Sequence, residues 1–123
     1  MLTIPLINKF TCSPWQLNYF IQQLNNKQIL PILDYINENK DSSVNNIKVL
    51  SNLIMQYPNN YIAIKSSSLN IEKNEKLAYD TICTLVEKAI DKNSKILIDA
   101  EHYLIQDKID KLTDNLLVEF NKT

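Results

Sequence analysis

The fold of this chain is decided by the stretch YIAIK at residues 61–65, an apolar run that ends on a lysine. A continuous apolar run of this length is typical of a strand in a parallel sheet, where helices cover the strand. Just before it, PNN at 58–60 interrupts a segment whose apolar residues recur at helical spacing. We therefore predict a buried strand over residues 61–65 that follows a helix after a short turn.

Two further apolar runs of the same kind flank this one along the chain. ILPIL at 29–33 is followed by Asp34, and ILI at 96–98 is followed by Asp99. Strands that alternate with helices through short turns predict a parallel sheet. We therefore expect strands at about 29–34, 61–65 and 95–99.

Four helical segments accompany these strands. The first opens with a Ser13 cap, Pro14 and Gln16, a capping-box pattern, and ends near residues 25–26. The second lies between the polar loop at 40–43 and Pro58, and the others span about 71–92 and 105–120. The residues expected to face inward are Leu17, Phe20, Ile21 and Leu24, then Ile47, Leu50, Ile54 and Tyr57, then Ala78, Ile82, Leu85, Val86 and Ala89, and finally Ile105, Ile109, Leu112, Leu116 and Phe120.

The chain contains no glycine, which excludes the phosphate-binding P-loop and the dinucleotide-binding fingerprint. Each predicted helix-to-strand turn carries asparagine instead, at 25–26, 59–60 and 93. Asparagine is the next-best residue for the left-handed conformation that closes a helix. We therefore expect one α/β domain over residues 1–123, built as a leading helix and three parallel strand–helix units.

Composition limits the classes of partner. The net charge is −1, which argues against a nucleic acid, and no apolar run approaches the roughly 20 residues of a membrane span. MLTIPLI at 1–7 is too short for a secretory signal core, and no arginine-rich presequence is visible. Cys12 and Cys83 form no metal-ligand spacing, so we expect reduced thiols. The basic side chains other than His102 are all lysine, so the chain lacks the bidentate guanidinium that best grips carboxylates.

Charged residues follow all three predicted strands. Asp34, Lys65 and Asp99 stand at the strand ends, with Glu101 and His102 just beyond the last. The carboxyl ends of parallel strands share one rim, where α/β folds place their chemistry. The pattern therefore suggests a site, although polar residues also commonly mark strand exits. Three carboxylates and His102 could alternatively hold a divalent cation, a hypothesis that the positive charge of Lys65 opposes.

The strand ends also carry a resemblance to a known family. ILDY at 32–35 with Glu38, then YIAIK at 61–65, then IDAE at 98–101, occur in that order. IDKLT at 109–113 and EFN at 119–121 follow. Together these motifs resemble the first half of proline dehydrogenase, and the likeness covers the chain from about residue 10 to residue 121.

The resemblance implies a (β/α) barrel that binds FAD and oxidises L-proline to pyrroline-5-carboxylate. By resemblance, Lys65 matches a second-strand lysine beside the substrate carboxylate and the flavin. Asp99 matches a third-strand acid that holds a substrate-binding arginine in place. Asp34 and Glu101 match motif positions on the same rim. A mitochondrial location is implied if the eukaryotic family pattern holds, and a cytoplasmic one otherwise.

The chain departs from this family in several ways. A complete barrel needs eight strands and roughly 250 residues, so three strands amount to a partial barrel. The family draws most flavin contacts and both carboxylate-binding arginines from later segments, and SSSLN at 66–70 replaces a Leu-Thr-Ala-Leu-Gly-like stretch. We therefore expect no bound FAD and no turnover of L-proline by this chain alone. The alternative is a non-catalytic remnant or interaction protein, which pairs through its open sheet edges with itself or with a complementary half-barrel.

Overall fold

The computed structural model describes residues 11–36 and 43–121, and the chain divides into two compact units, Met1–Pro31 and Ile32–Thr123. In the first unit, the 3-10 turn η1 (Pro14–Gln16) leads into helix α2 (Leu17–Asn26). The backbone N–H of Ser13 donates to Oε1 of Gln16 at 3.2 Å. The helix start predicted from the capping pattern is therefore confirmed.

The end of α2 differs from the expectation. Asn25 and Asn26 are both helical, and the left-handed residue is Gln28, with φ of 61°. The N–H of Ile29 donates to the carbonyl of Leu24 at 2.9 Å, and that of Gln28 donates to Asn25 at 2.9 Å. These two bonds form a Schellman closure, which needs its left-handed residue two places beyond the last helical one. The prediction of a left-handed asparagine at 25–26 was wrong for this reason.

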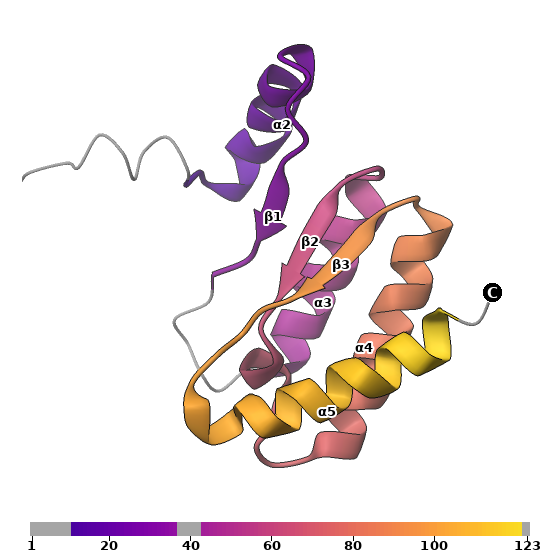
Figure 1. Ribbon diagram of the computed structural model, residues 1–123. Helices are drawn as coiled ribbons and strands as arrows, with labels where there is room; N and C mark the ends of the chain where they lie inside the picture. The colour runs from indigo at the N-terminus through magenta and orange to yellow at the C-terminus, as the bar shows by residue number, and fades with distance from the viewer. Residues whose placement is uncertain (1–10, 37–42, 122–123) are drawn as a thin grey trace, which may run out of the picture. The chain divides into compact units, whose positions relative to one another are not determined.

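The second unit alternates strands and helices (Figure 1). Its strands are parallel and lie in the order β1-β2-β3, as predicted. The elements are β1 (Ile32–Asp34), α3 (Ser43–Gln56), β2 (Tyr61–Ile64), the 3-10 turn η2 (Ser66–Leu69), α4 (Glu75–Asp91), β3 (Lys95–Ile98) and α5 (Tyr103–Phe120). The expected α/β class with three strand–helix units is therefore confirmed.

The core of this unit forms between the central strand and its helices. Ile62 and Ile64 on β2 are completely buried. Helix α3 packs against α4, where Nζ of Lys88 donates to Oγ of Ser51 at 2.6 Å, and α4 packs against α5. Their buried apolar residues are Leu50 and Ile54 of α3, Ala78, Ile82, Leu85 and Ala89 of α4, and Ile109, Leu112 and Leu116 of α5. Ile47, Tyr57, Val86, Ile105 and Phe120, also expected inside, are only half-buried.

The first strand is shorter and more exposed than expected. The prediction covered about 29–34, but β1 has three residues, and only Leu33 among them is buried. Ile32 is 58% exposed although it belongs to an apolar run. Pro31 precedes the strand directly and has no N–H to donate to a ladder, which limits pairing on its side. The apolar run therefore marked the place of the strand but overstated its length and its burial.

The connection from β2 to α4 also differs from the expectation. Residues 66–68 form part of η2, and Ser66 and Leu69 are buried. Helix α4 begins at Glu75 instead of about residue 71, because Oδ1 of Asn74 accepts the N–H of Leu77 at 3.0 Å and caps it. Asn70, which ends η2, has φ of 61°.

Asparagine does take the left-handed conformation at the other two predicted turns. Asn59 has φ of 65° and Asn93 has φ of 53°. Nδ2 of Asn93 donates to Oδ1 of Asn59 at 2.9 Å, so the two turns are also joined to each other. Asn60 instead has a buried side chain that donates to the carbonyls of Tyr57 and Pro58. Asparagine therefore takes the place of glycine at these two turns.

Candidate functional site

The candidate site is the C-terminal end of the sheet, where Asp34, Lys65, Asp99 and Glu101 follow the strands; we call these four the rim residues. Ile64 pairs with Ile98, and the N–H of Asp99 donates to the carbonyl of Ile64 at 3.0 Å. Lys65 and Asp99 are therefore the next residues along the two neighbouring strands. Asp34 pairs with Ala63, two residues before Lys65.

Asp34 and Lys65 are in contact. Nζ of Lys65 lies 3.5 Å from Oδ2 of Asp34, and the two side chains are 43% and 37% exposed. Asp34 pairs with Ala63, and side chains two apart on an extended strand share a face, so the two charges lie on one side of the sheet. A partly exposed ion pair of this kind contributes about 0.2–1 kcal/mol to stability. The ion pair therefore contributes little to the free energy of unfolding, and its main effect is to place the Lys65 ammonium beside Asp34.

The backbone around Lys65 is fixed by the serines that follow it. The carbonyl of Lys65 accepts the N–H of Ser68 at 3.0 Å and its hydroxyl at 2.6 Å. Nδ2 of Asn46 on α3 in turn donates to the carbonyl of Ser68 at 3.0 Å. Three successive serines after a strand are a sequence signal that could have predicted this hydrogen-bonded turn.

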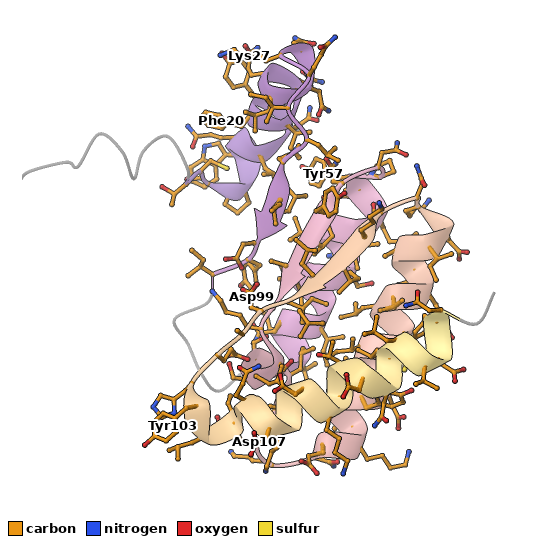
Figure 2. The ribbon with its side chains drawn as sticks, viewed as in Figure 1. Phe20, Lys27, Tyr57, Asp99, Tyr103 and Asp107 are labelled. Atoms are coloured by element: carbon orange, nitrogen blue, oxygen red, sulfur yellow. The ribbon has the colours of Figure 1, made fainter. Side chains whose placement is uncertain are left out.

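Asp99 lies at the end of β3 (Figure 2) and has no side-chain partner among the described residues. It lines a hollow of about 390 Å³ together with Gln106, Asp110 and Asp114 of α5. The predicted clustering of Asp34, Lys65 and Asp99 at one end of the sheet is thus observed, but the ion pair joins only the first two.

Glu101 is occupied by the neighbouring loop. Its carboxylate accepts the backbone N–H of Ser67 at 3.0 Å and also the hydroxyl of Ser67. Its own N–H donates to Oε1 of Gln106 at 2.9 Å. Glu101 therefore ties the β3–α5 connection to η2, so it holds the rim together instead of projecting a free carboxylate. Glu38, which belongs to the first family motif, lies outside the described residues.

The alternative of a divalent cation site finds no geometric support. Nδ1 of His102 accepts the N–H of Leu104 at 3.3 Å, so the imidazole caps α5. Its ring lies 4.5 Å from that of Tyr103. Across residues 11–36 and 43–121, no three side chains of His, Cys, Asp or Glu lie close enough to hold a metal ion.

A pocket of about 510 Å³ opens at this end of the second unit. Two lysines, Lys65 and Lys73, and two acids, Glu72 and Glu101, line it beside a few apolar side chains. The remaining lining residues are Tyr35, Ile36, Asn46, Leu50, Ala63, Ser67, Ser68, Asn70, His102 and Ile105. The pocket is therefore polar and of mixed charge.

The rim residues do not by themselves fit the flavin or the substrate that the resemblance implies. The FAD pyrophosphate and the proline carboxylate are anions, whereas the rim holds three carboxylates and one ammonium. That ammonium is already paired with Asp34. With no arginine in the chain, nothing supplies a planar bidentate contact to an oxyanion. A bidentate contact to an oxyanion at this site therefore needs groups from outside this chain.

Cys12 and Cys83 are both free thiols in this structure. Burial raises the pKa of the Cys83 thiol, and its hydrogen bond with Tyr79 offsets this only in part. The same hydrogen bond is the main reason that the pKa of Tyr79 is raised. Cys12 is exposed, so the two thiols lie in different surroundings.

We expect iodoacetamide to modify Cys83 more slowly than Cys12 at pH 8, because a raised pKa leaves less of the reactive thiolate. Peptide mass spectrometry at timed intervals measures both rates in one sample. Unfolding in urea removes the environment of Cys83 and should bring the two rates together. A faster reaction at Cys83 in the folded chain would contradict this assignment.

The described helices include none that is long and apolar enough to cross a membrane. In comparisons with known proteins, no protein-family model matches this chain. No curated protein matches it at a significant level of similarity either.

Proposed function

We propose that this chain is a proline dehydrogenase-like module, the first part of a (β/α) barrel, and that it does not oxidise L-proline alone. The observation that carries the proposal is the Lys65–Asp34 pair, with its 3.5 Å separation, at the carboxyl ends of two adjacent parallel strands. The family motifs place a lysine and acids at these strand ends in this order. A mitochondrial location accompanies the proposal under the eukaryotic family pattern.

In an assembled barrel, Lys65 would present a positive charge to the substrate carboxylate. Asp34 holds the ammonium in place, and the bonds from Ser68 fix the backbone carbonyl of Lys65. Asp99, which has no side-chain partner among the described residues, is available to orient a cationic side chain from another segment. FAD, when bound by the complete barrel, would accept the hydride; the protein groups named here supply binding and orientation.

The module alone lacks the means to hold its substrate. A lysine is a point charge, and it does not fix the orientation of a carboxylate as a bidentate guanidinium does. Orientation of the reacting carbon against the cofactor supplies a large part of the rate enhancement. The chain contains no arginine to provide this geometry. We therefore expect no flavin absorbance and no turnover from the purified chain.

The test mixes the purified chain with a polypeptide that carries the remaining strands of a proline dehydrogenase barrel. Reduction of a dye by L-proline and the visible flavin spectrum are recorded for each part and for the mixture. We expect activity in the mixture only, and its loss with Lys65→Ala. Lys76→Ala is the matched control, because Lys76 is exposed on α4 and pairs only with Asp80 in the described structure.

Each outcome decides the proposal. Stoichiometric flavin and proline-dependent dye reduction by the chain alone would overturn the statement that the chain is inactive by itself. A mixture that remains inactive and colourless would overturn the statement that the chain is part of a proline dehydrogenase-like enzyme. In that case the second candidate stands, an interaction protein, which the outer edge of β3, unpaired among the described strands, favours.

A further inference from the structure

The outer edge of β3 is open. β3 pairs with β2 on one side, and no described strand pairs with its other side (Figure 1). The N–H groups of Lys95 and Asp99 donate to Asn60 and Ile64, so these odd-numbered positions face β2. Because backbone polar groups alternate along a strand, Ile96 and Ile98 turn their N–H and C=O groups to the open edge. Such an edge is a template for another strand.

An apolar groove runs along this edge. It has a volume of about 500 Å³ and lies between β3, α4 and α5. Ile96 and Ile98 form one wall, and Ile90 of α4 and Leu117 of α5 form others. Ile90 and Leu117 are 58% and 52% exposed, so the groove leaves large apolar side chains in water. A patch of this kind marks an interaction surface.

The sequence of the edge is complementary to itself. KILID at 95–99 has an apolar centre, a lysine at one end and an aspartate at the other. We propose that a second copy of this chain binds here, its β3 antiparallel to the first and centred on Leu97. Lys95 of each copy then lies opposite Asp99 of the other, and the two ion pairs are equivalent by symmetry. This inference is argued from the sheet edge alone, but the remaining strands of a barrel would pair with the same edge of β3, so the dimer and an assembled barrel would compete for this edge and for Asp99.

The hydrogen-bond pattern and the charges select this register. Centring on Leu97 sets Ile96 opposite Ile98 of the second copy, and these are the residues whose polar groups face the edge. A shift by two residues keeps the hydrogen bonds but sets Lys95 or Asp99 opposite Leu97, and the one acid it can bring opposite Lys95 is Glu101, which lies beyond β3 and is bonded to Ser67. Cross-strand pairs of opposite charge stabilise a sheet, and like charges destabilise it. The Leu97-centred register is therefore preferred over its neighbours.

The surroundings of the edge agree with this pairing. The Asp99 carboxylate has no partner within its own described chain, whereas the Lys95 ammonium lies 5.5 Å from the centre of the Tyr61 ring on β2 and would turn from it to the edge on pairing. Ile96 and Ile98 line the groove together with Lys95 and Leu97. Residues directly opposite each other in an antiparallel pair share a face, so Ile96 and Ile98 of the second copy would lie beside those of the first, next to the groove. A two-fold contact of this type closes on itself and gives a dimer, not a filament.

The first test reverses the charges. Sedimentation velocity is measured for the unaltered chain, for Lys95→Asp, for Asp99→Lys, and for an equimolar mixture of the two variants. Each variant alone sets like charges opposite each other at both ends, so its dimer dissociation constant should rise roughly tenfold or more. In the mixture every pair is again opposite in charge, so dimers should return. The double variant Lys95→Asp/Asp99→Lys should also dimerise.

The second test reads the register. Leu97→Cys is introduced after Cys12→Ser and Cys83→Ser have removed the native thiols. The two Leu97 positions form a non-hydrogen-bonded pair with Cα atoms about 4.5 Å apart, within the range for a disulfide. Oxidation should therefore give a covalent dimer. Glu87→Cys in the same background is the control, since residue 87 is exposed on α4 and does not line the groove.

A chain that sediments as a monomer up to millimolar concentration would overturn the proposal. So would single charge variants that dimerise as tightly as the unaltered chain, or a mixture that stays monomeric. Equal cross-linking at residues 87 and 97 would indicate random collision and count against the register. Circular dichroism of each variant confirms that the chain is folded, so that loss of the dimer is not loss of structure.

Discussion

Replacement of Ile62 by alanine is expected to lower the free energy of unfolding by about 2–5 kcal/mol. Ile62 is completely buried at the centre of the sheet, where it pairs with Leu33 of β1 and Ile96 of β3. The substitution loses the transfer free energy of the removed atoms. It also leaves a cavity, and the strands on both sides restrict how far the surrounding structure can relax into it. Since small domains are stable by only about 5–15 kcal/mol, the effect is a large share of the total.

Ile32→Ala provides a matched control for this prediction. It removes the same atoms from the same sheet, but Ile32 is 58% exposed. We expect it to cost less than about 1 kcal/mol, because most of its surface is already in water. Urea unfolding followed by circular dichroism measures both. Equal costs for the two substitutions would show that β2 is not the centre of the core.

Much of the fold was predictable because its signals are local. The burial of Ile62 and Ile64 follows from a continuous apolar run, and α2 starts where the Ser13–Gln16 pattern places it. The length and burial of β1 were overestimated because an apolar run does not show how many backbone hydrogen-bond partners a strand has. Pro31 limits pairing, and β1 has β2 on one side only in the described sheet.

The site was predictable in its location but not in its contacts. Parallel topology alone brings Asp34, Lys65 and Asp99 to one end of the sheet. Which carboxylate pairs with Lys65 depends on a two-residue offset in register, which apolar patterning does not determine. The bond from Ser67 to Glu101 joins residues 34 apart in sequence, and no local motif signals it. Long-range polar contacts of this kind require the structure.

Ser66→Ala is expected to raise the free energy of unfolding by about 1–3 kcal/mol, an unusual sign for a core substitution. Ser66 is completely buried, and its hydroxyl has no hydrogen-bond partner in the described structure. A buried polar group without a partner costs its desolvation free energy, which alanine avoids with almost the same shape. The carbonyl of Ser66 accepts the N–H of Ile71, and alanine preserves this bond.

Ser68→Ala, two residues along the same turn, should act in the opposite direction. Its hydroxyl donates to the carbonyl of Lys65 at 2.6 Å, and the loss of a satisfied bond costs about 0.5–1.5 kcal/mol. Both variants replace a serine of η2 by alanine. A difference in their stabilities therefore reports whether each hydroxyl has a hydrogen-bond partner, and not a general effect of altering η2. Urea midpoints for the two variants and the unaltered chain measure the difference. If Ser66→Ala also destabilises, the Ser66 hydroxyl makes a hydrogen bond in solution, and the turn that holds Lys65 is then stabilised by both serines.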